Sequence, residues 1–411
     1  MEKGMKMKTI INVKRFLLIL ILLGTMMMTG CWNRRELSDL SIVSAIGVDK
    51  LQDDEYRVSF QIINPSEVAG KSSGGGGGYS LPVSVYYGAG KTIREATLNV
   101  SKQLPRRIFF SHVRLMVIGE TLAQDGIKEL FDFIERFYEA RLNINVLIAR
   151  NGDAKSVIDI LSPIEKVPGT SVVDQLKLAS SEFSSNMSSE VVDVIKMIVS
   201  EGKELSISGI QILGNPKSGR QQTNLRTTEP KAMLAISGIA VFKDMKLATW
   251  LDGDELYGTE WTLNKMKNTI VTLDCQQKEN SLDIIVLRSK TKLHAKVTAG
   301  KPSIDIEIKE EGDVAEVRCG LDLSDPEEIM KLENAFAEKT KRMVLAAVQK
   351  AQKARTDIFG FGEYVNMENP KAWKKLKGDW STTFAEVPVN VEVTAYIRRT
   401  GLVTKPYFYK K

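Results

Sequence analysis

The sequence is poor in the residue types that build metal centres and in long apolar runs. Its 411 residues include only three cysteines and two histidines, so a zinc-type cluster of His and Cys ligands is excluded. After residue 31, no apolar run is long enough to cross a bilayer. We therefore expect a body without a His/Cys metal site and without a membrane-spanning segment downstream of residue 31.

The sequence also lacks a large excess of charge once its N-terminal segment is set aside. The whole chain has 57 Lys and Arg against 51 Asp and Glu, a net charge of +6. Residues 1–30 hold five of the basic residues and one of the acidic ones, which leaves 52 against 50, or +2. Because nucleic-acid-binding surfaces are strongly basic, we expect no nucleic-acid partner.

The N-terminus has the organisation of a lipoprotein signal peptide. Basic residues precede the short apolar run 16–23, and residues 28–31 read Met-Thr-Gly-Cys. This order of a basic region, an apolar region and small residues is typical of a secretory signal. A cysteine directly after the small residues makes the segment a lipobox, so the sequence predicts a signal peptide over residues 1–30.

Processing at the lipobox would attach a diacylglycerol to the sulfur of Cys31 and cut between Gly30 and Cys31. A single acyl chain binds a membrane only marginally, at about 0.8 kcal/mol per buried methylene, whereas two chains bind stably. We therefore predict a mature chain that begins at Cys31 and is anchored to the outer face of a membrane. Arg34 and Arg35 would then lie close enough to contact lipid headgroups.

The two remaining cysteines are Cys275 and Cys319. They could form a disulfide bond if they lie on neighbouring strands. Two buried free thiols fit the sequence equally well, so the pairing stays open at this point.

Hydrophobic periodicity predicts an α+β fold. Up to about residue 202, short apolar strands alternate with helices such as 92–104 and 121–138, which indicates a mixed sheet covered by helices. From residue 269 onward, long strands alternate between apolar and charged residues, the pattern of an antiparallel sheet with one wet face. A long helix is then predicted, with Asp325 as its N-cap and Pro326 as its first helical residue.

We expect three mixed α/β domains with largely antiparallel sheets and a long helix in the last domain. They span residues 31–202, 203–265 and 266–411, after the signal peptide.

Gly88-Ala89-Gly90-Lys91-Thr92 lies between a predicted strand and a predicted helix, where a phosphate-binding loop would lie. That motif needs a glycine five positions before Gly90, and Val85 stands there. The sequence therefore favours a plain turn in which Thr92 caps the helix.

Two further groups of polar residues could suggest a site of chemistry. His112 beside Ser111 lacks the turn of a serine hydrolase, so we interpret it as a polar residue at a strand start. Asp252, Asp254 and Glu255 lack the spacing of a calcium loop and are better explained as acids at a helix N-terminus.

Residues 369–380 form the densest basic and aromatic stretch of the chain. Asn369 can cap a short helix opened by Pro370, with Trp373 on the buried face and the lysines in water. Contact with anionic lipid is the alternative, and packing is the interpretation we favour. We predict no catalytic, cofactor-binding or metal-binding residue in the chain.

Several separated segments together resemble one protein family. They are residues 31–37 (Cys-Trp-Asn-Arg-Arg-Glu-Leu), 45–49 (Ala-Ile-Gly-Val-Asp), 111–120, 357–364 (Asp-Ile-Phe-Gly-Phe-Gly-Glu-Tyr) with Pro370, Trp373 and Trp380, and 397–401. These segments resemble the C subunits of spore germinant receptors, the Ger(x)C lipoproteins of endospore-forming bacteria. The resemblance extends over essentially the whole mature chain.

The resemblance implies a family-specific fold of three α/β domains and a lipid anchor on the outer face of the spore inner membrane of a Gram-positive endospore former. It implies a receptor complex with membrane A and B subunits, which bind nutrients and trigger germination. It implies no enzyme activity and no cofactor. It leaves open whether this subunit itself binds a nutrient.

The alternative is a lipid-anchored solute-binding protein of a transporter. Such proteins usually have two similar α/β lobes around a ligand cleft. The change from mixed α/β sequence to long antiparallel strands counts against this alternative.

Overall fold

The structure is a computed structural model, and it describes residues 14–19, 39–69, 81–137, 139, 141–184, 187 and 189–401. The chain separates into two compact units, Met1–Ser41 and Ile42–Lys411. The fold described below is that of the second unit. Among the described residues, no helix is both long enough and apolar enough to cross a membrane.

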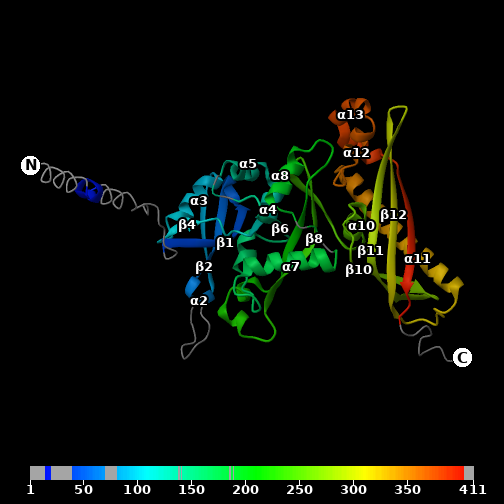
Figure 1. Ribbon diagram of the computed structural model, residues 1–411, viewed down its shortest axis with the longest axis horizontal. Helices are drawn as coiled ribbons and strands as arrows, with labels where there is room; N and C mark the ends of the chain where they lie inside the picture. Colours follow the sequence, from blue (N-terminus) through cyan, green and yellow to red (C-terminus); the bar gives the residue numbers. More distant parts are fainter. Residues whose placement is uncertain are drawn as a thin grey trace, which may run out of the picture. The chain divides into compact units, whose positions relative to one another are not determined.

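The first sheet is mixed, in the order β3-β2-β1-β5-β6-β7-β8-β9, with β4 paired to β1 (Figure 1). Its central strands β1, β5, β6 and β7 are parallel, and the outer pairs are antiparallel. The strands are β1 (Leu40–Lys50), β2 (Tyr56–Ile63), β3 (Val83–Gly90), β4 (Arg107–Phe109), β5 (Leu115–Gly119), β6 (Asn145–Ala149), β7 (Ser206–Gly214), β8 (Ala232–Lys243) and β9 (Lys246–Leu251).

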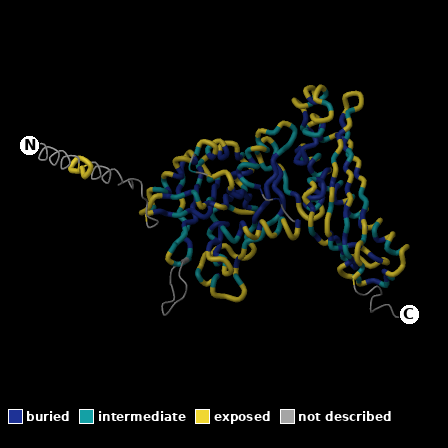
Figure 2. The backbone as a smooth tube through the Cα atoms, in the orientation of Figure 1, coloured by how far each residue is buried: buried dark blue, intermediate teal, exposed yellow. Residues whose placement is uncertain are grey.

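Helices cover both faces of this sheet. One apolar core gathers side chains of α3 (Ile93–Ser101), α4 (Glu120–Asp125), α5 (Lys128–Arg136) and α8 (Val191–Val199). A second core gathers those of α6 (Ala154–Asp159) and α7 (Pro168–Glu182) on the opposite face. All residues of β5 and β6 are therefore buried (Figure 2), as expected for parallel strands. Two short helices, α2 (Pro65–Ala69) and α9 (Pro216–Gly219), lie in loops.

The predicted helix over 121–138 is wrong in one respect, because the structure divides it into α4 and α5. Gly126 stands at the break with φ 134°, a backbone conformation that side-chain-bearing residues avoid. Its N–H closes α4 on the carbonyl of Leu122. The apolar residues on both sides keep helical spacing, which is why periodicity alone did not reveal the break.

The second sheet has the order β10-β11-β12-β13. Its strands are β10 (Thr269–Cys275), β11 (Lys278–Thr298), β12 (Lys301–Val317) and β13 (Val389–Arg399). The first three are antiparallel and β13 joins parallel to β12. Alternate residues of β11 and β12 are buried and pack against helices, namely α10 (Gly253–Thr262), α11 (Pro326–Ala354), α12 (Phe361–Glu368), α13 (Pro370–Leu376) and α14 (Trp380–Glu386).

These elements confirm the predicted α+β class, the wet-faced sheet and the long helix. Asp325 caps α11 by accepting a hydrogen bond from the N–H of Glu327. Strands β7 to β9 continue the first sheet, and the division of the chain into domains stays a prediction. Cys275 and Cys319 form a disulfide bond, with 6.1 Å between their Cα atoms.

Helix α10 crosses α11 at very short range. A Cβ built on Gly258 of α10 would lie 2.0 Å from the carbonyl oxygen of Met343 in α11. Since the obstacle is backbone, no side-chain rotation can relieve it, and a larger residue must push the two helices apart.

We predict that Gly258→Ala destabilises the protein by about 2 kcal/mol or more, despite the higher helix propensity of alanine. Gly378→Ala is the matched control, because a Cβ at Gly378 meets no atom within 4 Å. Urea unfolding of both variants measures the difference. Equal stability of the two variants would show that the helices are not packed as closely as described.

Candidate functional site

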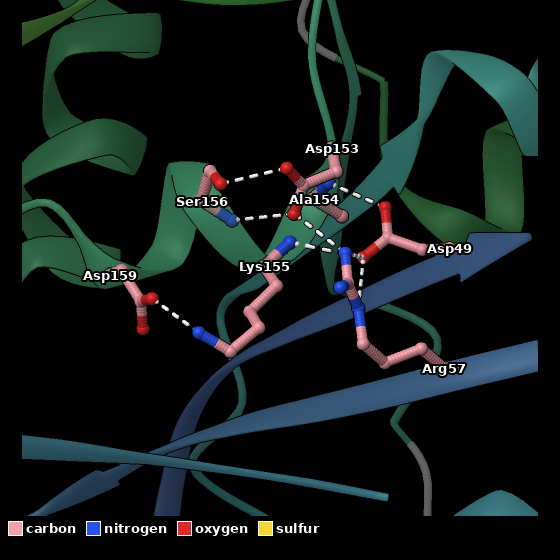
Figure 3. A network of polar contacts seen from close by, with 7 residues as sticks. All are labelled: Asp49, Arg57, Asp153, Ala154, Lys155, Ser156 and Asp159. Carbon is pink, nitrogen blue, oxygen red and sulfur yellow. Dashed lines mark hydrogen bonds and ion pairs between the residues drawn. The ribbon is translucent and has the colours of Figure 1, made fainter. Parts of the chain in front are cut away.

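The parallel strands β1, β5 and β6 end at one edge of the first sheet, the edge where α/β proteins commonly bind ligands. Asp49 lies at the end of β1 and points toward the first turn of α6 (Figure 3). Its carboxylate accepts hydrogen bonds from the backbone N–H groups of Ala154 (2.6 Å) and Lys155 (3.2 Å). Gly119 at the end of β5 leaves room for it, because a Cβ there would lie 2.2 Å from the Asp49 Oδ1.

Arg57 on β2 completes this cluster. Its Nη2 donates to Asp49 at 2.8 Å and to Asp153 at 2.7 Å (Figure 3). Asp153 also caps α6 through the N–H of Ser156. Burial raises the pKa of Asp49, while the Arg57 guanidinium opposes this shift. The cluster fixes α6 to β1 and β2.

Side chains that follow β5 and β6 extend the same edge. Glu120 accepts hydrogen bonds from the N–H of Asn151 (2.6 Å) and from the indole of Trp250 (3.0 Å). Arg150 forms a bidentate pair with Asp252, at 2.5 and 2.7 Å. These polar groups at the sheet edge are therefore hydrogen-bonded or ion-paired with other groups of the chain. This arrangement suits a structural role.

A second polar cluster lies where α11 ends. Asp357 is buried and its carboxylate accepts from three successive backbone N–H groups, those of Gly360 (2.9 Å), Phe361 (3.0 Å) and Gly362 (2.8 Å). The indole of Trp380 donates a fourth hydrogen bond at 2.9 Å. Burial raises the pKa of Asp357 to about 6, against the lowering effect of these donors.

The Asp357 cluster holds residues 200–204, which connect α8 to β7. The N–H of Glu204 donates to the Asp357 carbonyl at 2.7 Å, and the hydroxyl of Ser200 donates to Glu363 at 2.5 Å. Gly202 has φ 93°, and a Cβ there would lie 2.7 Å from the ring of Trp373. The cluster therefore joins the helices beside the second sheet to the first sheet, and we call it the junction.

A hollow of about 340 Å³ opens at the junction. The basic side chains that line it are Lys203, Arg355 and Lys377, and the acidic ones are Glu204, Asp244 and Asp357. Burial and the nearby charges of Asp244 and Asp357 raise the pKa of Glu204 to about 7, with Lys243 acting in the opposite direction.

The predicted lipidation site lies outside the described residues. Gly30, Cys31, Arg34 and Arg35 belong to this part of the chain, so lipid attachment, cleavage and headgroup contact stay predictions.

The structure confirms the predicted helix cap at Thr92, whereas His112 lies in a turn before β5 and not at the start of the strand. Thr92 caps α3 through the N–H of Glu95, and His112 contacts the ring of Phe109. The acids at the start of α10 form ion pairs, Asp254 with Lys339 and Glu255 with Lys350. Among the described residues, no group of three or more His, Cys, Asp or Glu side chains could hold a metal ion.

The packing interpretation of residues 369–380 is also confirmed. Asn369 caps α13 through the N–H of Ala372. Trp373 is buried and meets Trp380 edge-to-face, with 5.2 Å between the ring centroids. Lys377 pairs with Glu201 across the junction at 3.1 Å.

Asp357 begins one of the segments on which the family resemblance rests, but its role as a buried hydrogen-bond acceptor was not predicted. An aspartate followed by glycines at the third and fifth positions is the local signal of a carboxylate that receives a run of backbone N–H groups. The partner segment 200–204 has no signal of its own, since it meets Asp357 only through the fold.

Comparison with known proteins identifies the family. Residues 33–212 match the family described as "Spore germination protein N-terminal domain", and residues 237–401 match "Spore germination B3/ GerAC like, C-terminal". The two matches together cover most of the chain, and the chain belongs to the Ger(x)C family of spore germination proteins.

Individual relatives cover nearly the full length. Spore germination protein KC of Bacillus subtilis is 35% identical over 96% of this chain and 97% of its own. The putative spore germination protein YfkR of the same organism is 27% identical over 94% and 97%. The crystal structure of the GerBC protein shares the fold, with a TM-score of 0.51 and 20% identity over 86% of this chain and 96% of that one.

We predict that Asp357→Asn destabilises the protein by about 2–4 kcal/mol, because an amide cannot accept from all four donors and leaves buried N–H groups unpaired. Urea unfolding measures the change. The exposed Asp379, which directly precedes α14, offers the control, and Asp379→Asn should stay within about 0.5 kcal/mol of the parent. Similar losses in both variants would contradict the role given to Asp357.

Glu204 should make the stability of the junction depend on pH. Because its pKa is raised from 4.5 to about 7 in the folded protein, the folded state retains a proton that the unfolded state has lost. Stability should therefore fall as the pH rises from about 4.5 through 7. Glu204→Gln should flatten this part of the profile in urea unfolding, whereas Glu201→Gln should not; parallel profiles for all three proteins would refute the assignment.

Proposed function

We propose that the chain is a non-enzymatic, lipid-anchored subunit of a nutrient germinant receptor. It acts with membrane A and B subunits to trigger spore germination. Family membership over nearly the whole chain carries this proposal, since the relatives are named as spore germination proteins.

The described contacts support a structural rather than a chemical role. The carboxylates at the edge of the first sheet accept hydrogen bonds from backbone and side-chain groups of the chain itself. The junction is likewise formed by buried hydrogen bonds and packed aromatic rings. Such a body suits a subunit that presents fixed docking surfaces to partners and relays their conformational state.

The proposed location is the outer face of the spore inner membrane, with the lipid on Cys31. An anchor of two acyl chains confines the body to the membrane surface and raises its effective concentration near the membrane subunits. The proposed domains, 31–202, 203–265 and 266–411, would supply the docking surfaces. Direct nutrient binding by this subunit is not part of the proposal.

The alternative of a solute-binding protein receives no support from the fold. The two sheets of this chain differ in strand number and topology. Solute-binding proteins are usually built from two similar lobes. Thermal stabilisation of the protein by a single nutrient would revive this alternative.

We predict that a strain carrying Cys31→Ala loses the protein from its spore membrane fraction and loses germination with nutrients. Germination with a non-nutrient trigger should persist, because later steps do not need the receptor. Immunoblots of membrane fractions and germination assays with a panel of single nutrients test this, with the deletion strain and the parent as references. Normal localisation and normal germination in Cys31→Ala spores would refute the anchoring part of the proposal.

A further inference from the structure

The segment 215–231, between β7 and β8, carries an unusual set of cations. It contains four basic residues against a single acid, Glu229. All four basic side chains are exposed, and within the described part of the chain none of them forms an ion pair. They are Lys217, Arg220, Arg226 and Lys231.

Apolar side chains are exposed directly beside these cations. Ile164 is 94% exposed in the loop that follows α6. Met233 and Leu213 are 46% and 44% exposed and lie opposite each other on β8 and β7. A hollow of about 230 Å³ is lined by Ile164, Met233 and their neighbours, so these side chains form one surface rather than scattered points.

The fold fixes the cationic segment against the Ile164 loop. Asn224 is buried and its amide donates to the carbonyls of Leu161 and Ala232, both at 3.0 Å. The N–H of Leu161 donates to the carbonyl of Gly219 at 3.0 Å. The cations and the exposed isoleucine therefore keep a constant relation to each other, and we call them the basic surface.

A second hollow, of about 680 Å³, lies within the basic surface. Its lining includes Lys217, Arg220 and Asn215, together with Asp159 of α6. Asp159 is paired with Lys155 at 2.5 Å, so the charges left over in this hollow are positive. Its size and charge suit a phosphate-bearing headgroup.

We propose that the basic surface lies against an anionic lipid bilayer. This inference rests on the proposed function, because the anchor on Cys31 would keep the body beside such a bilayer. An anionic membrane surface attracts unpaired Lys and Arg side chains, and a protruding aliphatic side chain inserts among the headgroups. An acidic protein would satisfy the cations, but a bilayer satisfies both the cations and the exposed Ile164.

The test uses the lipid-anchored protein on vesicles, with a polarity-sensitive fluorophore on Ile164→Cys. Because Cys275 and Cys319 are disulfide-bonded and Cys31 is acylated under the proposal, the new thiol is the only free one. On vesicles containing phosphatidylglycerol, the emission should shift to the blue and a lipid-borne quencher should reduce it. On pure phosphatidylcholine, both effects should be largely lost.

A charge series makes the test quantitative. Replacing Lys217, Arg220, Arg226 and Lys231 one after another by glutamine should lower the ratio of docked to undocked probe about fivefold for each cation removed at low salt. High salt should have the same effect. The control probe is Met330→Cys on α11, where Met330 is 58% exposed and should show no response to lipid charge.

Three outcomes would contradict the proposal that the basic surface lies against an anionic bilayer. They are equal emission on both vesicle types, an equal response of the Met330 probe, and a response to an acidic polypeptide that phosphatidylglycerol does not reproduce. The last outcome would point to a protein partner. A protein that does not remain on vesicles of either composition would instead refute anchoring at Cys31, and with it the proposed function, so the two failures are distinguishable.

Discussion

The buried carboxylate of Asp357 is the interaction on which the architecture of the second unit most depends. Its side chain is almost fully buried and accepts hydrogen bonds from three backbone N–H groups and one indole N–H. Loss of this acceptor would leave several buried donors unpaired, at about 1–3 kcal/mol each. The chain from residue 355 to 364 is therefore held in one conformation, including the left-handed residues Arg355 and Gly360.

That conformation decides how the two sheets are joined. Once the turn after α11 is fixed, the Asp357 carbonyl can receive the N–H of Glu204, and Gly202 can approach the ring of Trp373. The segment between α8 and β7 thus packs on a preformed surface. A body joined in this way resists independent motion of its halves, which suits the docking role proposed above.

Local sequence patterns were sufficient for most of the elements. Alternation of apolar and charged residues predicted β11 and β12, and capping residues predicted the starts of α11 and α13. The patterns did not reveal the break at Gly126, because apolar spacing continues across it. They also could not show that β7 to β9 continue the first sheet, because pairing between distant strands leaves no local trace in sequence.

The candidate sites were harder to predict than the elements for the same reason. Asp49 needs Arg57 on a neighbouring strand and the N-terminus of α6, about one hundred residues later, before its role becomes visible. The role of Asp357 likewise becomes visible only when residues 200–204 are seen packed against its turn. The Cys275–Cys319 pairing stayed open until the end of β10, which carries Cys275, and the loop after β12, which carries Cys319, were placed. A role that consists of long-range contacts can be assigned only when both partners are in view.

The paired and unpaired charges of the chain point to different tasks. Asp49, Arg57 and Arg150 are satisfied within the protein and are costly to disturb, since removing one member leaves a partly buried partner without compensation. The cations of residues 215–231 form no ion pair within the described part of the chain. They can therefore bind an external anion in place of water without breaking an ion pair of the protein. Charges of the first kind keep the body rigid, and charges of the second kind are available for binding. Under the proposed function, a rigid body with available cations on one surface can be held at a defined orientation beside a membrane, which a lipid on Cys31 alone would not fix.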